Sequence, residues 1–167
     1  MRRPHASGHG SHGSSTSLLP QFVRGIVLCR SNRWEEGLRF LREGTLLVGP
    51  SGSVPAVVLS YLGYAMALCE SKVDQGLELC KEAVRQSFVD PDMLLNLARA
   101  HLLAGNRQPA VMAIERGLKV DRDHQGLLDL RTEIGVRRQP ILGFLRRHHP
   151  LNRALGMIRH RFGRRSG

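Results

Sequence analysis

The fold is decided by residues 92–124, which read DMLLNLARAHLLAGNRQPAVMAIERGLKVDRDH. A polar break, Gly-Asn-Arg at 105–107, divides this stretch into two segments. On each side of the break, apolar and small residues recur three and four positions apart, which places them on one face of a helix. They are Leu94, Leu97, Ala98, His101 and Leu102 before the break, and Ala110, Ala113, Ile114, Gly117 and Leu118 after it. The stretch therefore predicts a hairpin of two amphipathic helices.

A single hairpin of this size cannot bury its apolar faces alone, so we expect the chain to repeat it. A shift of 34 residues takes Ala110 to Gly76, and a further shift of 39 takes Gly76 to Gly37. Along each second helix the order small, large, small is kept. The three sets are Gly37, Leu41 and Gly44; Gly76, Cys80 and Ala83; and Ala110, Ile114 and Gly117. The sequence predicts three copies of the hairpin.

The segments that lead into these small residues, NRWEEG at 32–37 and GNRQPA at 105–110, resemble the inter-helix turn of the tetratricopeptide repeat (TPR) family. The resemblance covers roughly residues 18–138. Some positions depart from the family pattern: its usual Tyr is replaced by Leu28, Ala67 and His101, and its usual closing Pro by Gly49, Phe88 and Arg122. The end of the chain is similar to the tails of short bacterial TPR proteins. The resemblance implies an all-α fold, a right-handed α-solenoid of about three hairpins with a capping helix and an amphipathic C-terminal helix.

The middle copy leaves its register open. Its Leu62-Gly63 pair comes one residue early for the family pattern. Either the turn of this copy is one residue longer, or its first helix departs from the pattern.

Composition suggests three regions. Residues 1–17 are rich in Gly, Ser and His and are expected to be disordered. The repeat domain is expected over 18–138, with copies at 18–51, 57–90 and 91–124 and a capping helix at 125–138. An Arg-rich amphipathic tail is expected over 139–167.

The net charge of +11 is unevenly distributed. Residues 18–133 carry 14 basic and 14 acidic side chains, whereas residues 134–167 add nine Arg and no acid. Such a tail attracts nucleic acid, an anionic membrane surface or an acidic protein without choosing between them. The tail residues that we expect to face an anionic partner are Arg146, Arg147, Arg153, Arg159, Arg161, Arg164 and Arg165.

Catalytic signatures are missing from the sequence. It has no phosphate loop, GxSxG, HExxH or CxxC motif, so we expect no enzyme activity, catalytic residue, metal site, cofactor or small-molecule substrate. On the packed side of its helix, His101 is best explained as a hydrogen-bonded core imidazole. Three cysteines without paired spacing, Cys29, Cys69 and Cys80, favour buried free thiols and a cytoplasmic location.

In the TPR family the first helices of successive repeats line a concave groove. The resemblance places Phe22, Ile26, Cys29, Tyr61, Ala65, Leu68, Leu95, Asn96, Arg99 and Leu102 on its wall. Because this set is mostly apolar, we expect it to hold a helical or extended apolar peptide. Some members of the family grip a terminal carboxylate with several basic and amide side chains, but here only Asn96 and Arg99 could do so.

The leading hypothesis is therefore a non-catalytic protein-interaction adaptor or scaffold. Two alternatives remain open: the basic tail binds nucleic acid or an anionic membrane, or the tail covers the array and fills the groove in cis. The single tryptophan, Trp34, opens the second helix of the first copy, and a packing role is preferred over a partner contact.

Overall fold

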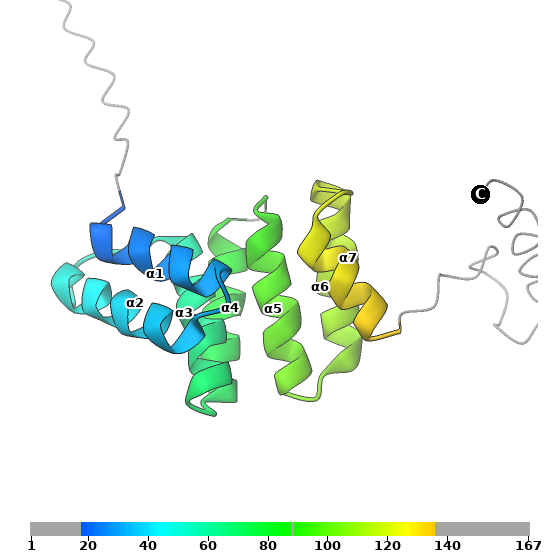
Figure 1. Ribbon diagram of the computed structural model, residues 1–167, viewed down its shortest axis with the longest axis horizontal. Coiled ribbons are helices and arrows are strands. Elements are labelled where there is room, and N and C mark those ends of the chain that lie inside the picture. Colours follow the sequence, from blue (N-terminus) through cyan, green and yellow to red (C-terminus); the bar gives the residue numbers. More distant parts are fainter. Residues whose placement is uncertain (1–17, 88, 136–167) are drawn as a thin grey trace, which may run out of the picture. The chain divides into compact units, whose positions relative to one another are not determined.

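The computed structural model describes residues 18–87 and 89–135, and all regular secondary structure in these residues is helical (Figure 1). The helices are α1 (Pro20–Arg30), α2 (Trp34–Val48), α3 (Ala56–Cys69), α4 (Val73–Gln86), α5 (Pro91–Leu103), α6 (Arg107–Val120) and α7 (Gln125–Glu133). The described residues divide into two units, with the boundary between Leu127 and Leu128 inside α7. The expected N-terminal region, the tail helix and the seven tail arginines lie outside the described residues. Within the described residues, no helix is long and apolar enough to cross a membrane.

Consecutive helices pack as three hairpins, α1 with α2, α3 with α4, and α5 with α6 (Figure 1). Neighbouring hairpins contact one another through α2 and α3 and through α4 and α5, and the first helices α1, α3 and α5 also touch in sequence. The predicted all-α array of three hairpins is confirmed.

Small residues set the distance between the two helices of a hairpin. Gly37, Gly76 and Ala110 are each the fourth residue of a second helix, and all three are buried. A Cβ atom on Gly37 would lie 2.9 Å from the carbonyl oxygen of Gly25, and one on Gly76 would lie 2.3 Å from that of Gly63. The helix backbones are thus in direct contact at these points, which explains why the spacing of small residues identifies the hairpins.

The register of the middle copy is settled by the turn lengths. Three residues separate Cys69 from Val73, as many as separate Arg30 from Trp34 in the first hairpin. The turn is therefore not longer. Instead, the close-approach glycine of α3 stands 13 residues before Gly76, whereas Gly25 stands 12 before Gly37. The first helix of the middle copy departs from the pattern.

Aromatic packing joins the first two hairpins. Trp34 is 9% exposed, stacks against Tyr61 with ring centroids 6.3 Å apart, and meets Tyr64 edge-on at 4.7 Å. Its indole Nε1 donates a hydrogen bond of 2.9 Å to the side-chain oxygen of Asn32. These contacts agree with the packing role expected for Trp34.

The cysteines are free thiols, and burial raises the pKa of both Cys29 and Cys80 to about 12. These two thiols are buried as expected, whereas Cys69 is only half-buried. The buried imidazole of His101 differs from expectation, because its Nδ1 has no hydrogen-bond partner among the described residues. Burial is the main cause that lowers the pKa of His101, and the charge of Lys81 on α4 lowers it further, so the ring remains neutral.

Replacing Gly76 with Ala should destabilise the chain by about 1 to 3 kcal/mol, because the new methyl group would meet the backbone of α3, which cannot move aside easily. The urea midpoint of unfolding, followed by circular dichroism, measures the change. Gln75→Ala is the control, since Gln75 precedes Gly76 on α4 and is exposed. It should change the stability by less than about 0.5 kcal/mol. Equal midpoints for the two variants would contradict the close helix contact.

Candidate functional site

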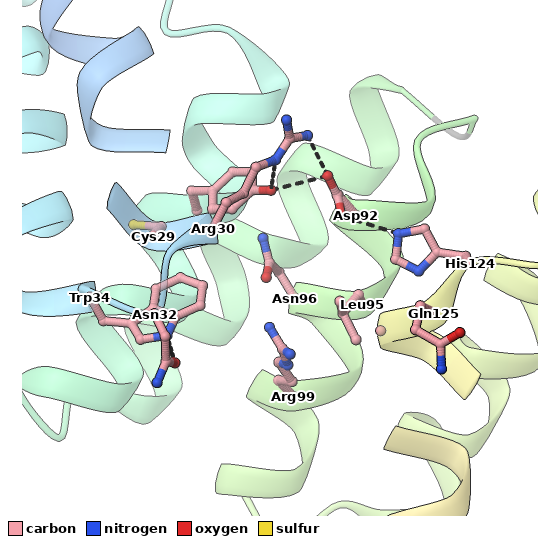
Figure 2. A pocket seen from close by; sticks show the side chains of 12 residues that line it. Cys29, Arg30, Asn32, Trp34, Asp92, Leu95, Asn96, Arg99, His124 and Gln125 are labelled. Carbon is pink, nitrogen blue, oxygen red and sulfur yellow. Dashed lines mark hydrogen bonds and ion pairs between the residues drawn. The ribbon is translucent and has the colours of Figure 1, made fainter. Parts of the chain in front are cut away.

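A hollow of about 420 Å³ lies where the first helices of the three hairpins meet the start of α7 (Figure 2). It is lined by Cys29, Arg30, Asn32, Trp34, Tyr61, Asp92, Leu95, Asn96, Arg99, His124, Gln125 and Gly126. Most of these residues come from α1, α3 and α5, the helices that the TPR resemblance assigns to the groove wall. We call it the central hollow.

The start of α5 orients Asp92. The side chain of Asp90 caps this helix by accepting hydrogen bonds from the backbone N–H groups of Asp92, at 2.8 Å, and Met93, at 3.4 Å. Pro91 occupies the first helical position, where a missing N–H costs nothing. As the second residue of α5, Asp92 thus stands at the positive end of the helix dipole, which favours its negative charge.

The carboxylate of Asp92 connects the three hairpins to the start of α7 (Figure 2). Arg30 forms an ion pair with its Oδ2 atom and donates a 2.9 Å hydrogen bond from Nε to the hydroxyl of Tyr61. That hydroxyl donates in turn to Oδ2 of Asp92 at 3.1 Å. The second carboxylate oxygen, Oδ1, lies 3.1 Å from Nε2 of His124. One side chain therefore receives groups from α1, from α3 and from the segment before α7.

The hydrogen bonds of His124 assign its tautomer. The backbone N–H of Leu127 donates to Nδ1 of His124 at 3.3 Å, so Nδ1 acts as an acceptor. With Nδ1 as an acceptor, the ring N–H is on Nε2, which donates to Asp92. His124 thus caps the first turn of α7 while it holds the Asp92 carboxylate.

The electrostatics of this network favour an ionised Asp92. Burial raises its pKa, but the hydrogen bond and charge of Arg30 and the hydrogen bonds from His124 and Tyr61 outweigh burial, so the pKa lies below its usual value. Burial is the main cause that raises the pKa of Tyr61 to about 12, which leaves its hydroxyl protonated and able to donate. The network is therefore complete at neutral pH.

Asn96 and Arg99 of α5 also line the central hollow, and Arg99 is a cation that a ligand can reach. Asn96 is 2% exposed and donates from its side-chain nitrogen to the hydroxyl of Ser60 at 3.2 Å. One helical turn further on, Arg99 lies with its guanidinium 5.6 Å from the ring centroid of Tyr64. In residues 18–87 and 89–135, no carboxylate forms an ion pair with Arg99. Arg99 is thus positioned to bind an anionic group.

A second hollow, also of about 420 Å³, adjoins the first and shares Asn32 and Trp34 with it. We call it the side hollow. Its other lining residues are Arg33, Glu35, Glu36, Leu68 and Cys69. Arg33 pairs with Glu36 at 2.5 Å, whereas Glu35 has no ion-pair partner in the described part of the chain. No group of three or more potential metal ligands is found in the described residues.

The residues expected on the groove wall fall into three sets. Tyr61, Leu95, Asn96 and Arg99 line the central hollow, as does Cys29, and Leu68 lines the side hollow. Phe22, Ile26 and Ala65 are buried in the core, and Leu102 is half-buried; these four line neither hollow. The assignment of these residues to a groove wall remains a prediction. The central hollow that several of them line is more polar than the mostly apolar wall expected from the sequence.

Several lining residues were not expected from the sequence. Asp92 could have been found, because it continues the helical spacing of Leu95, Asn96 and Arg99 toward the start of α5. Arg30 and His124 carry no comparable signal, since they reach the hollow from the ends of other elements.

No family model and no curated protein matches the sequence. Among solved structures, the chain is similar to the crystal structure of YrrB, described as a TPR protein with an unusual peptide-binding site. The two are 18% identical, the match covers 67% of this chain and 55% of YrrB, and the TM-score is 0.51. The crystal structure of PcrH in complex with the chaperone binding region of PopB matches with 15% identity, 69% and 89% coverage and a TM-score of 0.49. The chain thus has the TPR fold and spans about half the length of YrrB.

Replacing Asp92 with Asn should lower the free energy of unfolding at pH 7 by about 1 to 3 kcal/mol, because Arg30, Tyr61 and His124 lose a charged acceptor. The pKa of Asp92 is lowered in the folded state, so its contribution is present above about pH 4 and is lost as the pH falls through the folded pKa. The stability difference between wild type and variant should therefore shrink between pH 7 and about pH 3. Urea unfolding at several pH values measures it.

Asp74→Asn is the matched control, because Asp74 is also the second residue of its helix but is exposed. Its effect should stay below about 0.5 kcal/mol at pH 7. A pH-independent difference for Asp92→Asn would show that the ionised carboxylate does not hold the network together.

Proposed function

We propose that this chain is a non-catalytic interaction module that binds a peptide segment of a partner protein in the central hollow. The observation that carries the proposal is the half-buried Arg99, which faces this hollow without an acidic partner among the described residues. The TPR fold adds support, since the structurally similar YrrB is described as having a peptide-binding site.

The size and rigidity of the hollow suit a short segment. A volume of about 420 Å³ is within the range of pockets that hold a few side chains. The Asp92 network fixes the upper wall, and the packing of Trp34 against Tyr61 and Tyr64 fixes the side wall. A preformed wall reduces the entropy that a peptide must lose on binding, which favours affinity.

The lining chemistry supports binding over catalysis. The thiol of Cys29 is held neutral by a pKa of about 12, so it is a poor nucleophile. Both nitrogens of His124 are engaged, one by Asp92 and the other by the backbone of Leu127. The amide groups of Asn32, Asn96 and Gln125 and the guanidinium of Arg99 can orient a ligand but supply no general base.

Peptides selected from a random displayed library on the full-length chain should bind wild type and lose about tenfold or more in affinity with Arg99→Glu, which removes a cation and adds a like charge beside an acidic ligand group. Fluorescence anisotropy of the labelled peptides gives the dissociation constants.

Lys119→Glu is the control, because it makes the same change in charge on α6 at an exposed residue that lines neither hollow. It should leave the affinity within about twofold. Selected peptides that bind both variants as tightly as wild type would place the binding surface elsewhere.

A further inference from the structure

We infer that the partner segment is bipolar: an acidic side chain lies beside Arg99 in the central hollow, a basic side chain lies beside Glu35 in the side hollow, and apolar side chains cross the surface between them. This inference rests on the proposed function and specifies the chemistry of the ligand.

The two hollows form neighbouring parts of one surface. Both are lined by Asn32, which lies in the turn between α1 and α2, and by Trp34, the first residue of α2. A segment that fills the central hollow can therefore continue past Trp34 into the side hollow without leaving the protein surface.

The two hollows carry opposite charges, Arg99 in the central hollow and Glu35 in the side hollow. Arg99 packs over Tyr64, whose ring meets Trp34 edge-on, so the cation approaches Trp34 from α5. On the other side, Glu35 follows Trp34 directly in α2. After burial, the charge of Glu35 is the next cause that raises the pKa of Cys69, which places its carboxylate near the wall of the side hollow.

Neither charge is neutralised within the described residues. Glu36 is paired with Arg33 and Asp92 is paired with Arg30, so these neighbours compete little for a ligand. Arg99 and Glu35 form no ion pair with another described residue. They are the charges in the two hollows that a partner can complement.

The side hollow also offers apolar surface to a ligand. Leu68 projects from the end of α3 with 41% of its surface exposed, and it lines the side hollow together with Trp34 and Cys69. Covering such side chains removes apolar surface from water. The opposite charges of the two hollows add selectivity, because a segment of uniform charge meets repulsion in one of them.

The test uses four synthetic peptides that differ only in the two residues flanking a pair of leucines: Glu and Lys, Glu and Glu, Lys and Lys, or Gln and Gln. Binding to the full-length chain is measured by fluorescence anisotropy near 0.15 M salt, which screens the long-range attraction of the net charge of +11. Wild type should bind the Glu and Lys peptide at least about fivefold more tightly than each of the other three. Non-specific attraction by the basic chain would instead favour the peptide with two Glu residues.

Charge reversal supplies the decisive comparison. Arg99→Glu should shift the preference to the peptide with two Lys residues, and Glu35→Lys should shift it to the peptide with two Glu residues. Lys119→Glu should leave the wild-type preference unchanged, and circular dichroism checks that each variant is folded. Equal binding of all four peptides by wild type, no binding of any of them, or variants that keep the wild-type preference would each overturn the inference. Library-selected peptides that still depend on Arg99 would then leave the proposed function standing without the bipolar ligand.

Discussion

The contact between helix backbones within each hairpin is the constraint on which the rest of the structure depends. At Gly37 and Gly76 the opposing backbone lies so close that a single methyl group would not fit. The first helices of successive hairpins also contact one another. Asp92, on α5, receives the side chains of Arg30 and Tyr61 from the two preceding hairpins. The site thus depends on helices that pack closely both within and between hairpins.

Much of the fold could be predicted because its determinants are local in sequence. The recurrence of small residues and the capping of α5 by Asp90 and Pro91 depend on spacing alone. The candidate site was harder to predict from the sequence. Phe22 and Ile26 fit a groove stripe by register, but they are buried in the core, where Phe22 packs over Gly44. His124 is flanked by polar residues in the sequence, so no helical pattern identifies it as part of the site. Only the tertiary structure brings it to Asp92.

The distribution of apolar residues also explains the character of the surface. A small array must use most of its large apolar side chains to fill the spaces between helices. Phe22, Ile26 and Ala65, which were expected to meet a partner, are used in this way. Amide groups, charged groups and a few apolar side chains such as Trp34 and Leu68 line the two hollows. In the proposed interaction, a lining of this kind would select a ligand by the placement of its charges more than by its hydrophobicity.

In the middle hairpin the close-approach glycine of the first helix, Gly63, is displaced by one residue. The turn between the two helices has the same length as in the first hairpin. One residue of displacement corresponds to a rotation of about 100° around a helix axis. In α3 it accompanies Tyr61 and Tyr64, which both reach Trp34. A point substitution changes one side chain of a first helix. Insertion or deletion of one residue inside that helix would instead turn a different face of it toward the hollow, while the turns between helices keep their length.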